Sequence, residues 1–263
     1  MTSPSGAPPG ASPDSPLDVA EVLFHEVLDR PFLGLPSRHL VFFVLAGLLV
    51  LVVARLALRS YRDGNPRGLA AAVEALVVFI RDEVALKVIG EEGRRFTPLL
   101  LSFFSFILIA ALLGLLPFAA VSTGNLAVTM ALATVSFAAQ QGAGIAKYGL
   151  VGHLRNLVPP GLPLWLVPIM LPVEVLGMFT KPFALMVRLF ANMLAGHLVV
   201  TTLLLLIPLL ASMKPVLGWV VAPVSLGLAL FIMVLEVLVA FIQAYIFTLL
   251  TAIFIGVYVH PQH

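Results

Sequence analysis

The sequence predicts an all-α integral membrane protein with about five transmembrane helices. Of its 263 residues, 60% are hydrophobic and only 11% are charged, and the mean hydropathy is +1.09. A soluble domain carries about 25% charged residues, so this chain has too little polar material to cover a surface in water. Of the 28 charged residues, 21 precede position 97, which leaves long apolar stretches in the rest of the chain. These observations exclude a soluble protein and favour several membrane spans.

Residues 1–37 are expected to precede a membrane domain that occupies residues 38–263. The first 16 residues are rich in Pro, Ser, Gly and Ala, a composition typical of a disordered tail. From Leu17 to Asp29 the apolar residues recur at helical spacing, which predicts a short interfacial helix. The start has neither the basic residues nor the apolar segment of a signal peptide, so no cleaved leader is expected.

Three crossings are expected in the first 163 residues, because a crossing needs about 20 apolar residues. They are Leu40–Leu58, Pro98–Ala120 and Asn125–Ala146. Between the first two, the segment at about 69–90 is amphipathic and charged, which predicts a helix that lies on the membrane surface. Residues 147–163 contain two adjacent prolines and are expected to form a loop.

The last two apolar stretches are longer than upright crossings. Leu164–Ser212 is interrupted by prolines, Pro223–Val259 follows, and a polar break at Lys214 separates the two stretches. A stretch that exceeds one crossing but is too short for two is accommodated by tilting. We therefore expect a long tilted hairpin over residues 164–259.

Basic residues predict the orientation of the chain. Eight Lys or Arg residues lie between Arg55 and Arg95, and two more lie between Lys147 and Arg155. Loops rich in Lys and Arg stay on the cytoplasmic side. With five crossings, the N-terminus is then outside and the C-terminus is cytoplasmic.

Four charged residues fall within the hairpin, namely Glu174, Lys181, Arg188 and Glu236. A charge in the bilayer core costs roughly 3 kcal/mol or more, so each of them needs an explanation. Arg188 cannot lose its proton and therefore cannot relay one. A fixed cation does attract a carboxylate and lowers its pKa by about 1–3 units, which would force a passing acid to release its proton. The alternative is a structural ion pair of Arg188 with Glu174 or Glu236.

Helical spacing arranges the polar residues of the hairpin. Glu174, Lys181 and Arg188 are seven residues apart and share a stripe, with Asn192 near it and His197 on the opposite side. If the hairpin turns at Lys214, residues at equal depth have numbers that add to about 430. This register pairs Arg188 with Gln243 and His197 with Glu236. Taken singly, His197 is better explained as a hydrogen-bonded core histidine, and Asn192 and Gln243 are better explained by contacts between helices.

Two segments of the hairpin have a distinctive sequence. Arg188 to His197 reads RLFANMLAGH, and Leu238 to Thr251 reads LVAFIQAYIFTLLT. They resemble the signature and the last helix of subunit a of the rotary, F-type ATP synthase membrane sector. Gly114 to Pro117 and Asn125 to Thr129 resemble the middle helices of that family. The resemblance extends from about residue 40 to residue 259 and is densest near the C-terminus.

The resemblance implies a proton-conducting stator subunit beside a ring of c subunits, each with a carboxyl group in mid-membrane. Protons would reach this c-ring through one half-channel and leave through another, and the rotation would drive ATP synthesis elsewhere in the complex. Arg188 matches the essential arginine that faces the ring carboxylate. Gln243 and Asn192 match polar residues near that arginine.

The resemblance also implies residues of the proton path. His197 and Glu236 match a histidine and an acid on the path toward the ring, and Asn125 matches a weaker position there. Glu174 matches a polar position on the path out to the cytoplasm. Lys181 matches no position with an implied role. Two positions depart from the family pattern: Ala111 replaces an asparagine, which puts a channel role there in doubt, and Ala191 replaces a glycine with another small residue.

The implied partners are the c-subunit ring, the peripheral-stalk b subunits, the remaining ATP synthase subunits and membrane lipid, with no nucleic acid. The chain is not expected to be catalytic by itself or to hold a metal or cofactor, because it has no cysteine, no Walker loop and no His-Glu-x-x-His motif. The basic first loop fits a bacterial cell inner membrane. Two alternatives remain, a self-contained proton- or sodium-coupled transporter and a structural anchor.

Overall fold

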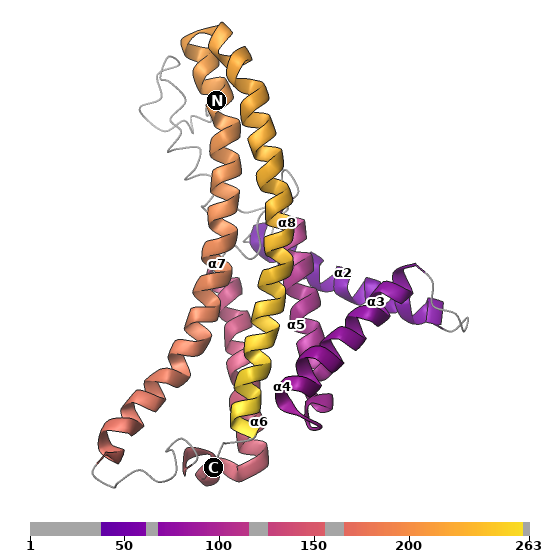
Figure 1. The fold of residues 1–263 in the computed structure, drawn as a ribbon, viewed down its shortest axis with the longest axis vertical. Coiled ribbons are helices and arrows are strands. Elements are labelled where there is room, and N and C mark those ends of the chain that lie inside the picture. Colours follow the sequence, from indigo (N-terminus) through magenta and orange to yellow (C-terminus); the bar gives the residue numbers. More distant parts are fainter. Residues whose placement is uncertain (1–37, 62–67, 116–125, 156–165, 260–263) are drawn as a thin grey trace, which may run out of the picture.

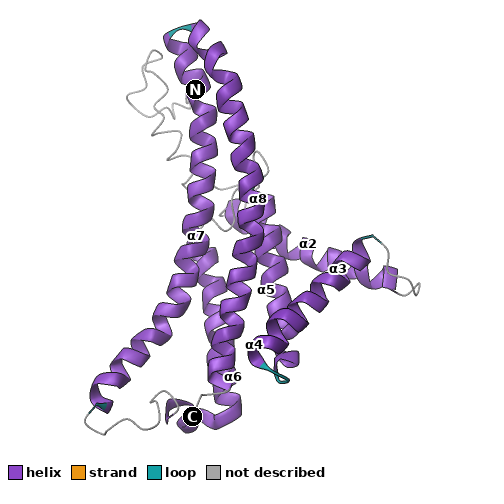
Figure 2. Cartoon of the chain, viewed as in Figure 1, coloured by secondary structure: helices purple, strands orange, loops and turns teal. Residues whose placement is uncertain are grey.

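The protein is helical throughout the parts that its computed structural model describes, residues 38–61, 68–115, 126–155 and 166–259, and these contain no strand (Figure 1, Figure 2). Five of the described helices are long and apolar enough to cross a membrane. The predicted all-α membrane fold is thereby confirmed. The predicted tail and interfacial helix in residues 1–37 lie outside the described residues, as does Asn125.

The first two predicted helices form where the sequence indicated them. Helix α2 (Arg38–Tyr61) covers the first expected crossing. The amphipathic segment is one continuous helical stretch made of α3 (Leu69–Val78), the π-helical η1 (Phe79–Leu86) and α4 (Lys87–Ile89). Its apolar face is buried in the protein core, whereas the charged residues of η1 stay on the exposed side. The sequence suggested that this apolar face lies on the membrane surface. In the structure the rest of the protein covers it.

A tight turn leads from α4 into α5 (Gly93–Gly114). Gly90 adopts φ 85°, a backbone conformation that favours glycine. Gly93 lies so close to η1 that a Cβ atom there would overlap the carbonyl oxygen of Ala85.

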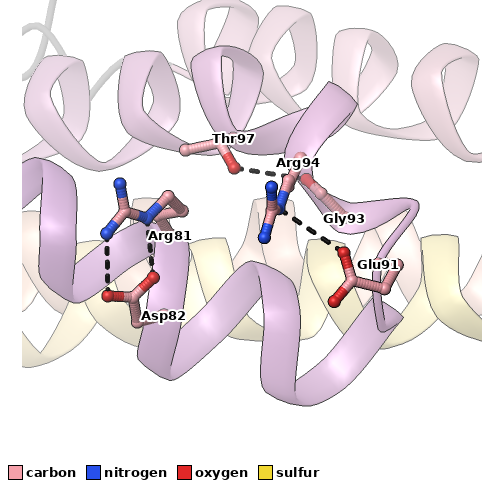
Figure 3. Close-up of polar contacts among 6 residues, drawn as sticks. All are labelled: Arg81, Asp82, Glu91, Gly93, Arg94 and Thr97. Carbon is pink, nitrogen blue, oxygen red and sulfur yellow. Dashed lines mark hydrogen bonds and ion pairs between the residues drawn. The ribbon is translucent and has the colours of Figure 1, made fainter.

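Charged side chains surround this turn on the exposed side (Figure 3). Arg81 donates hydrogen bonds to Asp82 at 2.6 and 3.0 Å, and Arg94 forms an ion pair with Glu91 at 3.5 Å. The hydrogen bond from Arg81 holds the pKa of the Asp82 carboxyl below its usual value. The Thr97 hydroxyl donates to the Gly93 carbonyl at 3.2 Å.

Helix α6 (Leu126–Arg155) is longer than predicted. The sequence indicated a loop from residue 147, but the chain stays helical to Arg155 and kinks at Gly149, where φ is 70° and ψ is 170°. The expected loop is therefore wrong for residues 147–155. Glycine tolerates the positive φ, so the chain turns sharply and resumes a helix without a long loop.

Helices α7 (Val167–Met213) and α8 (Pro215–Val259) form the predicted hairpin. Helix α7 is continuous through Pro172, Pro182 and Pro208, and α8 is longer than the sequence indicated, since it begins before residue 223. At 1.5 Å per residue, the 47 and 45 residues of these helices extend about 70 Å and 67 Å, against a bilayer core of about 30 Å. The two helices lie side by side near their turn, and α7 diverges from α8 toward its N-terminal end (Figure 1). A hairpin of this length has to be strongly tilted in a membrane.

The core surrounds the C-terminal half of α8. Buried residues of α8 recur every three or four positions from Ala240 to Val259, and they pack against η1, α4, α5 and α6. Toward the turn, by contrast, large apolar side chains such as Trp219 and Val224 are exposed. Helix α2 extends sideways from the hairpin and packs on α5 (Figure 1). One half of the hairpin is thus anchored in the bundle, and the other half presents apolar side chains outward.

Candidate functional site

The turn of the hairpin sets which residues of α7 and α8 meet. Lys214 is extended, at φ −150° and ψ 124°, and joins the two helices directly. A Cβ atom at Gly218 would lie 3.0 Å from the Ala211 Cα, and a Cβ atom at Gly196 would lie 2.8 Å from the Glu236 Cδ. Both pairs have numbers that add to about 430, the register inferred from the sequence.

A cavity of about 320 Å³ lies between α5, α7 and α8. Three of the predicted site residues line it, namely Asn192, Glu236 and Gln243. Small or apolar side chains complete the described wall, and Ala111 of α5 is one of them. The cavity thus brings a carboxylate and two amides together in otherwise apolar surroundings.

Glycine at position 196 makes room for the carboxylate in this cavity. A Cβ atom on Gly196 would overlap the Oε1 atom of Glu236. The neighbouring His197 is half-buried and interacts electrostatically with Glu236, so the two predicted partners lie together. Nothing in the sequence assigns a role to Gly196, because its contact with Glu236 forms only when α7 packs against α8.

Gln243 is the most buried of the predicted residues, with 7% of its surface exposed. Its Nε2 atom is buried and has no hydrogen-bond partner in the described part of the chain. An unpaired buried amide donor costs about 1–3 kcal/mol. Asn192 is exposed at the edge of the same cavity.

Arg188 faces away from the core. Its helix buries Leu185 and Leu189 against the bundle, whereas Arg188 itself is exposed together with Ala184 and Ala191. Among the residues that the structure describes, no carboxylate forms an ion pair with Arg188. The ion pair with Glu174 or Glu236 that the sequence left open is therefore not observed. Arg188 is not part of the described cavity wall, although Asn192 one turn further on is.

Glu174 is on α7 and lies far from this cavity, toward the C-terminal end of α8. It is half-buried and interacts electrostatically with Tyr258. Lys181, two turns along α7, places its Nζ atom 5.3 Å from the centre of the Phe254 ring and 5.9 Å from that of Tyr258. The structure therefore separates the predicted residues into a cavity group and a Glu174 group at opposite ends of the C-terminal half of α8.

The model of one protein family, described as ATP synthase A chain, matches residues 40–256 of the chain. The chain belongs to this family. Subunit a of ATP synthase from Myxococcus xanthus is 51% identical over 232 residues, which cover 86% of this chain and 74% of that relative. Subunit a from Anaeromyxobacter dehalogenans is 51% identical over 84% of this chain, but the matched region is only 57% of its length. Subunit a from Chloroherpeton thalassium is 46% identical over 86% of this chain and 68% of that relative.

As a member of the ATP synthase A chain family, the chain carries the predicted polar residues on a hairpin that the structure now describes. Within the described ranges, no three His, Asp or Glu side chains gather in a way that could hold a metal ion. The residues that the sequence analysis missed, Gly196 at the cavity and Tyr258 beside Glu174, act only through contacts between helices. Such contacts follow from the packing of α7 on α8 rather than from a local motif.

Proposed function

We propose that this chain is the proton-conducting stator subunit of an ATP synthase, with Arg188 facing a carboxylate on the c-ring. Membership of the family supports the general role of the chain, which is that of a proton-translocating subunit of the membrane sector. The chain conducts protons and makes or breaks no other bond. Its partners are the c-ring, the peripheral-stalk b subunits and the remaining ATP synthase subunits.

The exposed position of Arg188 carries the proposal. A permanent cation on the outer face of a membrane helix is costly unless an anion lies opposite. Small exposed residues, Ala184, Ala191 and Ala195, lie on the same side of α7 and allow a second helix to approach closely. A ring helix with a mid-membrane carboxyl group fits this face, because it supplies both the counter-charge and the close contact. The positive charge favours the deprotonated carboxylate, so an arriving ring site gives up its proton there.

The separation of the polar groups into two sets supports two half-channels. His197, Glu236 and the cavity that they adjoin form the path toward the ring, and Asn125 is a further candidate on it. Glu174 at the opposite end of α8 lies on the path away from the ring. Arg188 lies between Glu174 and His197 along α7 and keeps a proton from passing directly from one path to the other.

We place the protein in a bacterial cell inner membrane, with its N-terminus outside and its C-terminus in the cytoplasm. The Lys and Arg residues between α2 and α5, together with those around Lys147, support this orientation. The path through Glu236 then opens to the outside, and the path through Glu174 opens to the cytoplasm.

Proton pumping by the whole complex in vesicles tests the proposal. Arg188→Ala should abolish ATP-driven pumping while the complex still assembles, and His197→Ala or Glu236→Ala should slow it. If pumping survives Arg188→Ala, the proposal is wrong. Loss of assembly in all three variants would favour a structural anchor, and proton transport by the purified chain alone would favour a self-contained transporter.

A further inference from the structure

Lys181 is a cation within the apolar stretch of α7, and the proposed function leaves it without a role. Its side chain is half-buried, and within the described ranges no carboxylate forms an ion pair with it. Its Nζ atom lies instead over two rings of α8, 5.3 Å from the centre of Phe254 and 5.9 Å from that of Tyr258. An ammonium within about 6 Å of an aromatic ring centre is attracted by the negative face of the ring. A charge that is costly in lipid thus finds its partners on the neighbouring helix.

The two rings are held in place by the rest of the protein. Phe254 and Tyr258 are four residues apart, so they lie on one side of α8. The Phe254 side chain packs against the hydrophobic core. The Tyr258 ring contacts the ring of His153, a buried residue of α6, with centroids 5.3 Å apart. The rings therefore form a fixed surface, and the flexible partner in the contact is the side chain of Lys181.

Lys181 lies where α7 separates from the bundle. The buried residues of α7 begin at Pro182, and none of the described α7 residues before it is buried. The same end of α7 diverges from α8 in Figure 1. Just before Pro182, the ring of Phe179 lies 5.6 Å from that of Phe137 on α6, and Lys181 reaches the rings of α8. The Phe179 contact thus joins the diverging segment to α6, and the Lys181 contact joins it to α8.

We propose that Lys181 is a positioning residue of the proton path: its cation–π contacts with Phe254 and Tyr258 hold the N-terminal segment of α7 against α8. Glu174 is seven residues before Lys181 on this segment, about two turns, and Arg188 is seven residues after it. The contact therefore sets where the Glu174 carboxylate stands relative to α8 and to Arg188. This inference rests on the proposed function, because the position of Glu174 matters only if protons leave past it.

The first measurement asks whether Lys181 holds the two helices together in the whole ATP synthase, reconstituted in vesicles. Leu176 of α7 and Val257 of α8 are exposed and level with each other in the hairpin. Nitroxide labels on cysteines at these two positions report the distance between the helices, once the cysteines of the other subunits are replaced. Lys181→Met keeps a long side chain but removes the charge. The ratio of near to far label distances should then fall about twofold to thirtyfold, as for loss of a cation–π contact.

The second measurement is ATP-driven proton pumping, given per assembled complex. Lys181→Met should slow pumping in proportion to the loss of near distances. Lys181→Arg should pump normally, because a guanidinium also binds the faces of aromatic rings. The matched control is Lys214→Met, which removes an exposed lysine at the hairpin turn over which no ring of the described residues lies. It should pump like the unmodified complex.

A change on the aromatic side separates the cation–π contact from a direct effect of the charge on passing protons. Phe254→Leu keeps the ammonium and removes the nearer ring, so it should slow pumping as well. In a Phe254→Leu background, Lys181→Met should cause a smaller loss than it does alone, because the two changes disrupt one interaction. Phe254→Leu carries the test by itself if Lys181→Met does not assemble.

Unchanged label distances or normal pumping in Lys181→Met would overturn the inference. Slow pumping by Lys181→Arg, normal pumping by Phe254→Leu or a fully additive loss in the double variant would overturn it as well. These outcomes leave the proposed function intact if Arg188→Ala still abolishes pumping. Pumping by Arg188→Ala would instead contradict the proposed function itself.

Discussion

Replacing Gly196 by alanine should impair proton conduction by moving a single carboxylate. The added methyl group would overlap Glu236 Oε1 and lie 2.8 Å from its Cδ, so the two groups cannot keep their present positions. The overlapping atoms belong to the end of a flexible side chain that lines a cavity of about 320 Å³. Glu236 can therefore rotate into the cavity, and α7 and α8 need not separate.

The expected magnitudes differ for stability and for conduction. Alanine gains about 0.5–1 kcal/mol over glycine in a helix, which offsets part of the 1–3 kcal/mol that overpacking typically costs. The complex should therefore assemble normally. A displacement of about 1 Å at a reacting group can cost about a hundredfold in rate, so we expect pumping to fall between tenfold and a hundredfold.

The assay compares Gly196→Ala with Gly177→Ala in the reconstituted complex. Gly177 is also on α7, but nothing lies within 4 Å of a Cβ atom there, so its replacement should leave pumping unchanged. Shortening the acid in Gly196→Ala/Glu236→Asp should recover part of the lost rate. Equal pumping by Gly196→Ala and Gly177→Ala would refute the placement of Glu236 against Gly196.

Three further predictions concern stability, measured as thermal unfolding in detergent. Ser136→Ala leaves the buried Gln140 Nε2 without its 3.0 Å hydrogen-bond partner and should lower the free energy of unfolding by about 1–3 kcal/mol. Thr202→Val, at an exposed site, should lower the free energy of unfolding little. Lys147→Met removes the partly exposed ion pair with Glu92 and should cost less than about 1 kcal/mol, a difference that high salt should abolish. The Asp82 pKa is lowered in the folded protein, mainly by its hydrogen bond with Arg81, so the associated stabilisation is complete above about pH 4 and is lost as the pH falls through the lowered pKa. Asp82→Asn should not show this loss of stability in acid. If the thermal stability of Asp82→Asn and of the unmodified protein depended on pH in the same way, the prediction would be wrong.

The hydropathy of the chain was sufficient to predict the helices and the hairpin. Spans of apolar residues are a strong signal because every backbone polar group in lipid must be paired within the helix. The register was predictable for a related reason: once the turn is placed at Lys214, the equal rise of two helices fixes which residues are level. The sequence could not show how far the helices extend, since Pro172 and Pro208 mark breaks in water-exposed helices but are tolerated in α7.

The contacts of the site were harder to predict than its residues. Arg188 and Glu236 stand out in the sequence because a charge in an apolar stretch is rare. Gly196 does not stand out, and its role depends on the atoms of Glu236 across the hairpin. His153 lay in a segment predicted to be a loop, and only the kink at Gly149 brings it to α8.

The most direct test of the central claim asks which face of α7 meets the ring. The chain has no cysteine, so single cysteines can be introduced without interference. Ala191→Cys lies on the exposed face with Arg188, and Met186→Cys is buried against the bundle at 8% exposure. With a second cysteine next to the ring carboxylate, the account predicts a disulfide cross-link to Ala191→Cys and none to Met186→Cys. A cross-link to Met186→Cys, or none to either position, would contradict it.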